Sequence, residues 1–105
     1  MTRFIKVAKV QQMHDRRGTL VTVDGEEIAL FRRNGEIYAI NNVCSHQHFS
    51  MLHQGQIEEF EVMCPMHGWK YDIRTGNSTT GQGRVASYNT KVVGEDILIE
   101  LPESL

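Results

Sequence analysis

The pattern of apolar and polar positions in the first forty residues predicts β-strands. Short segments rich in branched and aromatic residues follow one another at residues 19–23, 27–31 and 36–40. The dipeptides Asp24-Gly25 and Asn34-Gly35 separate these segments, and such dipeptides favour two-residue hairpins because both turn positions take a positive φ. The pattern therefore predicts a three-stranded antiparallel meander.

The two ends of the chain add further strand signals. Residues 4–10 predict a first strand, and residues 84–93 and 96–101 predict a hairpin around Gly94-Glu95. The middle differs, because its strand-like segments are short and glycines interrupt them. We expect one all-β domain over residues 1–105, in which an antiparallel β sandwich-like base carries a loop-rich subdomain at about residues 42–83.

Both cysteines and four of the five histidines lie in this middle region. They form two matched half-motifs, Cys44-x-His46 and Cys64-x-x-His67, each offering one thiolate and one imidazole. Two neutral imidazoles in place of two thiolates leave the oxidised 2Fe–2S cluster and its ligands without net charge, which eases the addition of one electron. The alternatives are a Cys2His2 zinc site, which would make the chain a zinc-stabilised binding module, or a coincidence of unrelated residues.

The two half-motifs resemble the cluster-binding loops of the Rieske family. Residues 42–46 are similar to the first loop, and residues 64–76, which read CPMHGWKYDIRTG, are similar to the second. The resemblance implies the Rieske iron–sulfur fold and one 2Fe–2S cluster per chain. It further implies that Cys44 and Cys64 bind the inner iron, while His46 and His67 bind the outer iron.

Departures from the respiratory members of the family point to a subtype. Phe49 and Met66 stand where those members have a cysteine pair that forms a disulfide, and Trp69 replaces a serine whose hydroxyl bonds a cluster sulfur. Tyr71 matches the family's tyrosine. Because hydrogen bonds to the sulfurs raise the potential, we expect a potential at the low end of the Rieske range.

These features together resemble the soluble Rieske ferredoxins that serve bacterial aromatic-ring dioxygenases. The resemblance implies a one-electron carrier, which accepts electrons from a ferredoxin reductase and passes them to a terminal oxygenase or another oxidoreductase. No catalytic residues are recognised, so we do not expect an enzyme. A redox or iron–sulfur sensor would use the same four ligands, and the sequence does not separate it from a carrier.

Composition and charge limit the partners and the compartment. A net charge of −2 and a pI near 6.2 give no reason to expect nucleic acid or membrane as a partner. Lysines interrupt the apolar residues at the N-terminus, so no signal peptide is predicted, and we expect a cytoplasmic monomer. Two cysteines in that compartment favour ligation over a disulfide.

The remaining candidate residues have less specific signals. We expect His48, His53 and His14 to be surface residues, and Trp69 and Phe49 to pack around the cluster loops. Glu58, Glu59 and Glu61 form an acidic group that is either a solvated turn or a docking patch. Gly68 and Gly76 are predicted turn glycines.

Overall fold

The described residues form three antiparallel sheets. The computed structural model describes residues 2–15, 17–43, 50–65 and 68–102. The first sheet has the order β1 (Thr2–Lys9), β10 (Asp96–Pro102), β9 (Thr90–Val93). The second has the order β2 (Thr19–Val23), β3 (Glu26–Arg33), β4 (Glu36–Asn41), β8 (Ser87–Tyr88). The third has the order β5 (Gln56–Glu58), β6 (Glu61–Met63), β7 (Lys70–Asp72).

The meander β2–β3–β4 confirms the sequence prediction. Asp24 and Gly25 have φ values of 51° and 80°, and Asn34 and Gly35 have φ values of 53° and 79°. Both dipeptides therefore adopt the left-handed conformation that a two-residue hairpin needs. Two short 3₁₀ helices are found among the described residues, η1 (Val10–Gln12) and η2 (Leu52–Gln54), and both lie outside the sheets.

The C-terminal hairpin is shorter than predicted, and the prediction of one strand over residues 84–93 is wrong. The chain changes sheets at Asn89: β8 pairs with β4, where Tyr88 faces Ala39, whereas β9 pairs with β10. The Asn89 carbonyl accepts the Glu100 N–H at 2.9 Å, which fixes this crossing point. The strand is interrupted at Asn89, where its pairing changes from one sheet to the other, so the segment divides into β8 and β9.

The described residues pack into two cores on opposite faces of β3. Ile28 and Leu30 join a core that includes Ile97 and Ile99 of β10, so the first two sheets form the predicted sandwich-like base. The alternate residues Ala29 and Phe31 join a second core, shared with the segments around β5, β6 and β7. Because successive side chains on a strand point to opposite faces, β3 links the base to the middle region.

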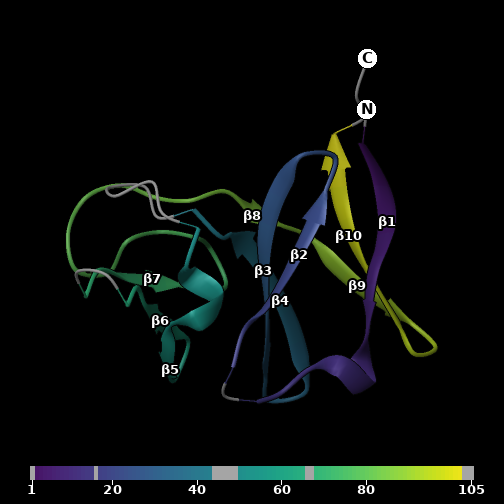
Figure 1. Cartoon of the computed structure of the whole chain (residues 1–105), viewed down its shortest axis with the longest axis horizontal. Helices are drawn as coiled ribbons and strands as arrows, with labels where there is room; N and C mark the ends of the chain where they lie inside the picture. The colour runs from purple at the N-terminus through teal and green to yellow at the C-terminus, as the bar shows by residue number, and fades with distance from the viewer. Residues whose placement is uncertain (1, 16, 44–49, 66–67, 103–105) are drawn as a thin grey trace.

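The third sheet stands apart from the base. Figure 1 shows β5, β6 and β7 on one side of the β2–β3–β4 sheet, with β1, β9 and β10 on the other side. All three strands fall between β4 and β8 in the sequence. Within the described part of the chain, no helix has both the length and the apolar character that crossing a membrane requires.

Candidate metal centre

Of the four predicted ligands, Cys64 lies within the described residues. Its side chain is 0% exposed and belongs to the second core, together with Leu52, Val62 and Tyr71. Cys44, His46 and His67 lie outside the described residues, as do His48, Phe49 and Met66. The geometry of the site therefore rests on Cys64 and on the described residues that flank both predicted loops.

The second predicted loop is closed by hydrogen bonds at its base. Cys64 donates its backbone N–H to the carbonyl of Trp69 at 2.7 Å, and Gly68 donates its N–H to the carbonyl of Cys64 at 3.1 Å. Gly68 has a φ of 75°, which glycine adopts without a steric penalty. The chain that leaves β6 therefore reverses within a few residues and enters β7. This confirms Gly68 as a turn glycine.

The first predicted loop also has a fixed base. Val43 and Ser50 form an antiparallel bridge, so residues 44–49 connect two positions that are paired with each other. The Val43 N–H donates to Oδ1 of Asn41 at 3.0 Å, and the Leu52 N–H donates to the carbonyl of Asn42 at 3.2 Å. Because Leu52 and Cys64 share one core, the bases of the two loops belong to the same packed unit.

Residues 76–85 form a segment that folds back along β7. Gly76 donates its N–H to the backbone carbonyl of Asp72 at 2.7 Å, and its own carbonyl accepts the Val85 N–H at 2.8 Å. Its φ is 81°. This confirms Gly76 as a turn glycine. Thr79 donates its backbone N–H to the Lys70 carbonyl at 2.9 Å, so the segment lies against the free edge of β7.

Trp69 contacts both this segment and the second core. It is half-buried against that core, which confirms the predicted packing role, and a Cβ placed on Gly81 would lie 2.6 Å from its Cζ3 atom. The segment can therefore approach the indole ring only because position 81 has no side chain. Trp69 thus ties residues 76–85 to the loop that carries Cys64.

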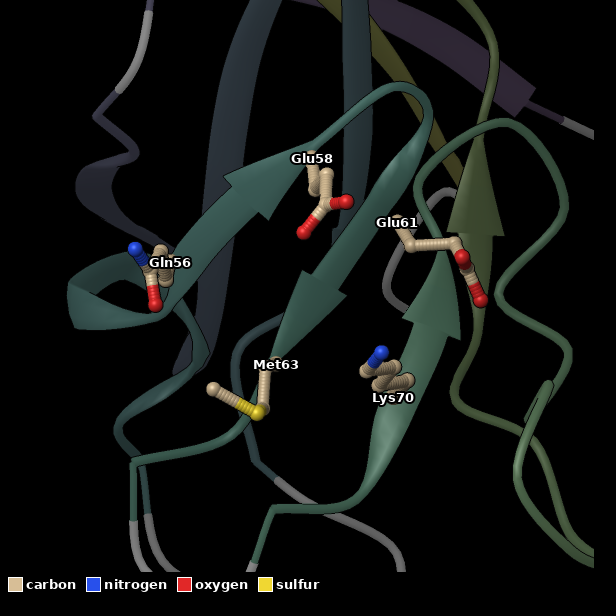
Figure 2. A pocket seen from close by; sticks show the side chains of 5 residues that line it. All are labelled: Gln56, Glu58, Glu61, Met63 and Lys70. Atoms are coloured by element: carbon tan, nitrogen blue, oxygen red, sulfur yellow. The ribbon is translucent and has the colours of Figure 1, made fainter.

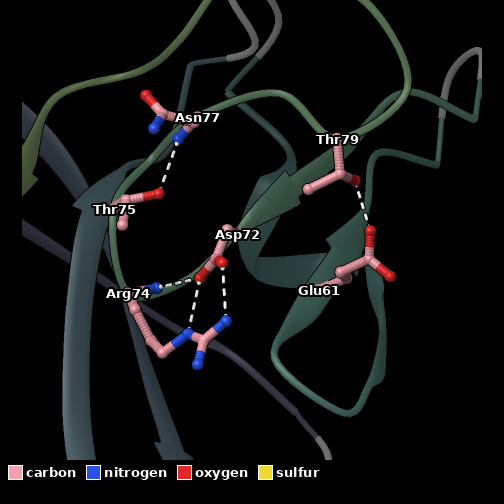
Figure 3. Close-up of polar contacts among 6 residues, drawn as sticks. All are labelled: Glu61, Asp72, Arg74, Thr75, Asn77 and Thr79. Atoms are coloured by element: carbon pink, nitrogen blue, oxygen red, sulfur yellow. Dashed lines mark hydrogen bonds and ion pairs between the residues drawn. The ribbon is translucent and has the colours of Figure 1, made fainter.

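An ion pair fixes the turn after β7. Figure 3 shows Arg74 donating to both carboxylate oxygens of Asp72, with Nε–Oδ1 at 3.0 Å, a terminal nitrogen to Oδ2 at 2.9 Å, and the Arg74 backbone N–H to Oδ1 at 2.8 Å. The hydrogen bonds from Arg74 hold the pKa of Asp72 below its usual value, although partial burial opposes this. In the same view, the Thr79 hydroxyl donates to the Glu61 carboxylate.

The acidic group lies at the β5–β6 turn. Figure 2 shows Gln56, Glu58, Glu61, Met63 and Lys70 lining a shallow pocket on the exposed face of the small sheet. Glu58 and Glu61 are paired across the two strands, and Glu59 is exposed with a φ of 57°. Like charges in paired positions cost little when solvent screens them, so this geometry suits a solvated turn. The alternative of a docking patch stays a prediction.

The remaining histidines that the structure describes behave differently from each other. His14 is exposed, as predicted. His53 is half-buried and hydrogen-bonded to Asn42, so the expectation of an ordinary surface histidine is wrong. Burial lowers the pKa of His53, and the Glu27 carboxylate partly offsets this shift. Sequence reasoning placed Asn42 in the first loop but did not predict its burial or its contact with His53, because an asparagine after a strand usually indicates only a turn.

Comparison with known proteins identifies the family. The Rieske [2Fe-2S] domain family matches residues 3–98. The chain is 36% identical over 83 residues to the naphthalene 1,2-dioxygenase system ferredoxin component of Pseudomonas aeruginosa, covering 77% of this chain and 79% of that one. It is 38% identical over 79 residues to the 3-phenylpropionate/cinnamic acid dioxygenase ferredoxin subunit of Escherichia coli K12, covering 73% and 74%.

A solved structure agrees with these relatives. The ferredoxin of carbazole 1,9a-dioxygenase from Nocardioides aromaticivorans IC177 superposes with a TM-score of 0.85 at 33% identity, covering 91% of this chain and 95% of that one. The chain belongs to the Rieske 2Fe–2S domain family. Within the family it is an electron carrier of the ferredoxin type rather than a catalytic enzyme, and its cofactor is a Rieske 2Fe–2S cluster.

The described residues fit this cofactor. A buried thiol in a tight loop can supply a thiolate ligand shielded from water, and the neighbouring Trp69, Leu52 and Tyr71 provide apolar surroundings. When bound, the cluster stores and releases a single electron at a potential set by its ligands and hydrogen bonds. What the described part of the chain contributes is one packed core that includes Leu52, after the first predicted loop, and Cys64, at the start of the second.

Proposed function

We propose that Cys44, His46, Cys64 and His67 hold the cluster, with the two thiolates on the inner iron and the two imidazoles on the outer iron. The donor set supports this proposal, because two thiolates balance the double positive charge of the ferric 2Fe–2S core and two neutral imidazoles add none. The burial of Cys64 and the hydrogen-bonded turn after it suit an inner ligand. We also propose that Trp69, which replaces a serine hydroxyl, leaves the potential at the low end of the Rieske range.

We further propose that one Rieske domain spans residues 1–105 and that residues 42–83 form its cluster-binding subdomain. The support is topological. Strands β5, β6 and β7 pair only with one another among the described strands, and they lie in the sequence between two strands of the base sheet, β4 and β8. An insertion of this kind leaves the pairing of the base strands intact.

The proposed role is to take one electron from a ferredoxin reductase and to pass it to a terminal oxygenase. The observation that carries this proposal is the match to ferredoxin components of dioxygenase systems, which spans 79% of the length of the Pseudomonas relative. The alignment therefore covers most of a protein that is named a ferredoxin component. We propose that the chain works as a cytoplasmic monomer with short-lived interfaces, because a carrier must release each partner before it meets the next.

A stopped-flow experiment tests the electron acceptor. The chain is reduced stoichiometrically and mixed with the oxidised terminal oxygenase encoded in its own gene neighbourhood. The proposal expects the carrier to be reoxidised within a single turnover, as its visible spectrum reports, while the oxygenase is reduced to a matching extent. A gene neighbourhood with a regulator and without an oxygenase or reductase would instead favour the sensor.

A further inference from the structure

Asn42 occupies an unusual position in the fold. It is the buried polar residue of the described chain, with 0% of its surface exposed, and it follows β4 two positions before Cys44. A buried amide is costly unless its donors and acceptors all find partners. The contacts of this side chain therefore indicate what it is for.

Every polar group of Asn42 has a partner, and most partners lie beyond the first predicted loop. Nδ2 donates to the Ser50 hydroxyl at 2.8 Å and lies 2.9 Å from Nδ1 of His53. Oδ1 accepts the His53 backbone N–H at 2.6 Å. Nδ1 of His53 also lies 3.2 Å from Oδ1, so it accepts from Nδ2 in one tautomer of the ring and donates to Oδ1 in the other.

The backbone of Asn42 ties the same point to the base of the fold. Its N–H donates to the carbonyl of Glu27 on β3 at 2.8 Å, and its carbonyl accepts the Leu52 N–H at 3.2 Å. The end of β4 and residues 50–53 are thus joined by side-chain and backbone bonds on both sides of residues 44–49. Burial also lowers the pKa of His53, which favours a neutral ring beside the buried amide.

We propose that Asn42 is a positioning residue of the cluster site, which acts by clamping the exit of the loop that carries Cys44 and His46 to its entrance. The inference rests on the proposed ligand set. Residues that orient ligands influence affinity and electronic properties without touching the metal. A loop whose two ends are held at one buried amide presents its ligands with less freedom than a loop closed by a backbone bridge alone.

The test compares holoproteins carrying Asn42→Asp, Ser50→Ala and the control Asn89→Ala. Asn42→Asp keeps the shape and Oδ1 but removes both donors, whereas Ser50→Ala removes one partner and leaves Asn42 in place. Asn89 is exposed, and its side-chain amide donates a hydrogen bond to Glu100 at 2.9 Å. Its replacement by alanine therefore removes an amide hydrogen bond outside the two predicted loops. Each holoprotein is examined by EPR after reduction, by redox titration, and by the rate of cluster loss to a chelator.

We expect Asn42→Asp to shift or broaden the EPR spectrum, to move the midpoint potential, and to speed cluster loss by about tenfold. Ser50→Ala should change the same quantities in the same direction by less, and Asn89→Ala should match the wild type. If Asn42→Asp yields no folded holoprotein, Ser50→Ala decides alone. A variant with a lower unfolding temperature but the wild-type spectrum and potential overturns the proposal, because that outcome is a purely structural role.

The wild-type spectrum separates this inference from the ligand assignment. A wild-type spectrum without the signature of mixed histidine–cysteine ligation overturns the ligand set whatever the variants do. A wild-type spectrum with that signature, together with unchanged Asn42 and Ser50 variants, overturns only the clamp.

Discussion

Replacing Gly76 by alanine tests how closely the segment at residues 76–85 is fitted to the fold. Gly76 has a φ of 81°, and a Cβ built on it would overlap the Val85 carbonyl oxygen and lie 3.1 Å from the carbonyl carbon. Gly25 has a nearly identical φ of 80° but has no atom within 4 Å of the added Cβ. The pair therefore separates the cost of the backbone conformation from the cost of the collision.

The expected magnitudes differ severalfold. A left-handed alanine costs about 1–2 kcal/mol, and the smaller entropy of the unfolded alanine chain returns part of this, so Gly25→Ala should cost about 1 kcal/mol. At Gly76 the backbone must also move. This movement weakens the 2.8 Å hydrogen bond from the Val85 N–H to the Gly76 carbonyl, which contributes about 1 kcal/mol. It also disturbs the packing of the buried Val85 side chain, which typically costs about 1–3 kcal/mol. Gly76→Ala should therefore cost about 3–5 kcal/mol.

Thermal unfolding of the two holoproteins, followed by circular dichroism and by visible absorbance, measures the difference. At about 4 °C per kcal/mol for a domain of this size, Gly25→Ala should lower the midpoint by about 4 °C and Gly76→Ala by about 12–20 °C. If the two variants unfold within a few degrees of each other, the close approach of Gly76 and Val85 is wrong.

Two further changes test the core and the ion pair. Leu52→Ala should lower the free energy of unfolding by about 3 kcal/mol, because Leu52 is fully buried in the core that also contains Cys64. Leu20→Ala should lower it by less than about 1 kcal/mol, because the Leu20 side chain is 40% exposed. Denaturant titrations measure both variants, and similar losses would refute the burial argument. Asp72→Asn, which removes the ion pair with Arg74, should lower the free energy of unfolding by about 1 kcal/mol at neutral pH. Because Arg74 depresses the pKa of Asp72, the wild type holds this stabilisation above the carboxyl's unfolded pKa and loses it as the pH falls through the folded pKa. Denaturation curves should therefore converge in acid, and a constant gap would contradict the assignment.

The parts of the fold that local sequence determines were the ones that could be predicted. Asp24-Gly25 sets its hairpin through the φ values of two adjacent residues, and no distant contact is needed. The division at Asn89 depends instead on which sheet each half of the segment meets, and that choice follows from tertiary packing. An apolar run such as residues 28–31 likewise does not tell a strand buried on both faces from other buried segments.

In the candidate site, too, the features set by local sequence could be predicted, and those set by tertiary contacts could not. The spacing of Cys44, His46, Cys64 and His67 predicts a cluster, because ligand chemistry requires particular side chains whatever the fold. The roles of Asn42 and His53 could not be predicted, since each depends on bonds to residues on the far side of a loop. A polar residue at the end of a strand indicates a turn, and only its burial identifies a clamp.

EPR of the dithionite-reduced protein tests the central claim most directly. Mixed ligation by two cysteines and two histidines predicts a rhombic signal with a low average g value, which all-cysteine clusters do not give. An all-cysteine spectrum, or the absence of any signal from an iron-loaded sample, would contradict the assignment of Cys44, His46, Cys64 and His67 as the ligands.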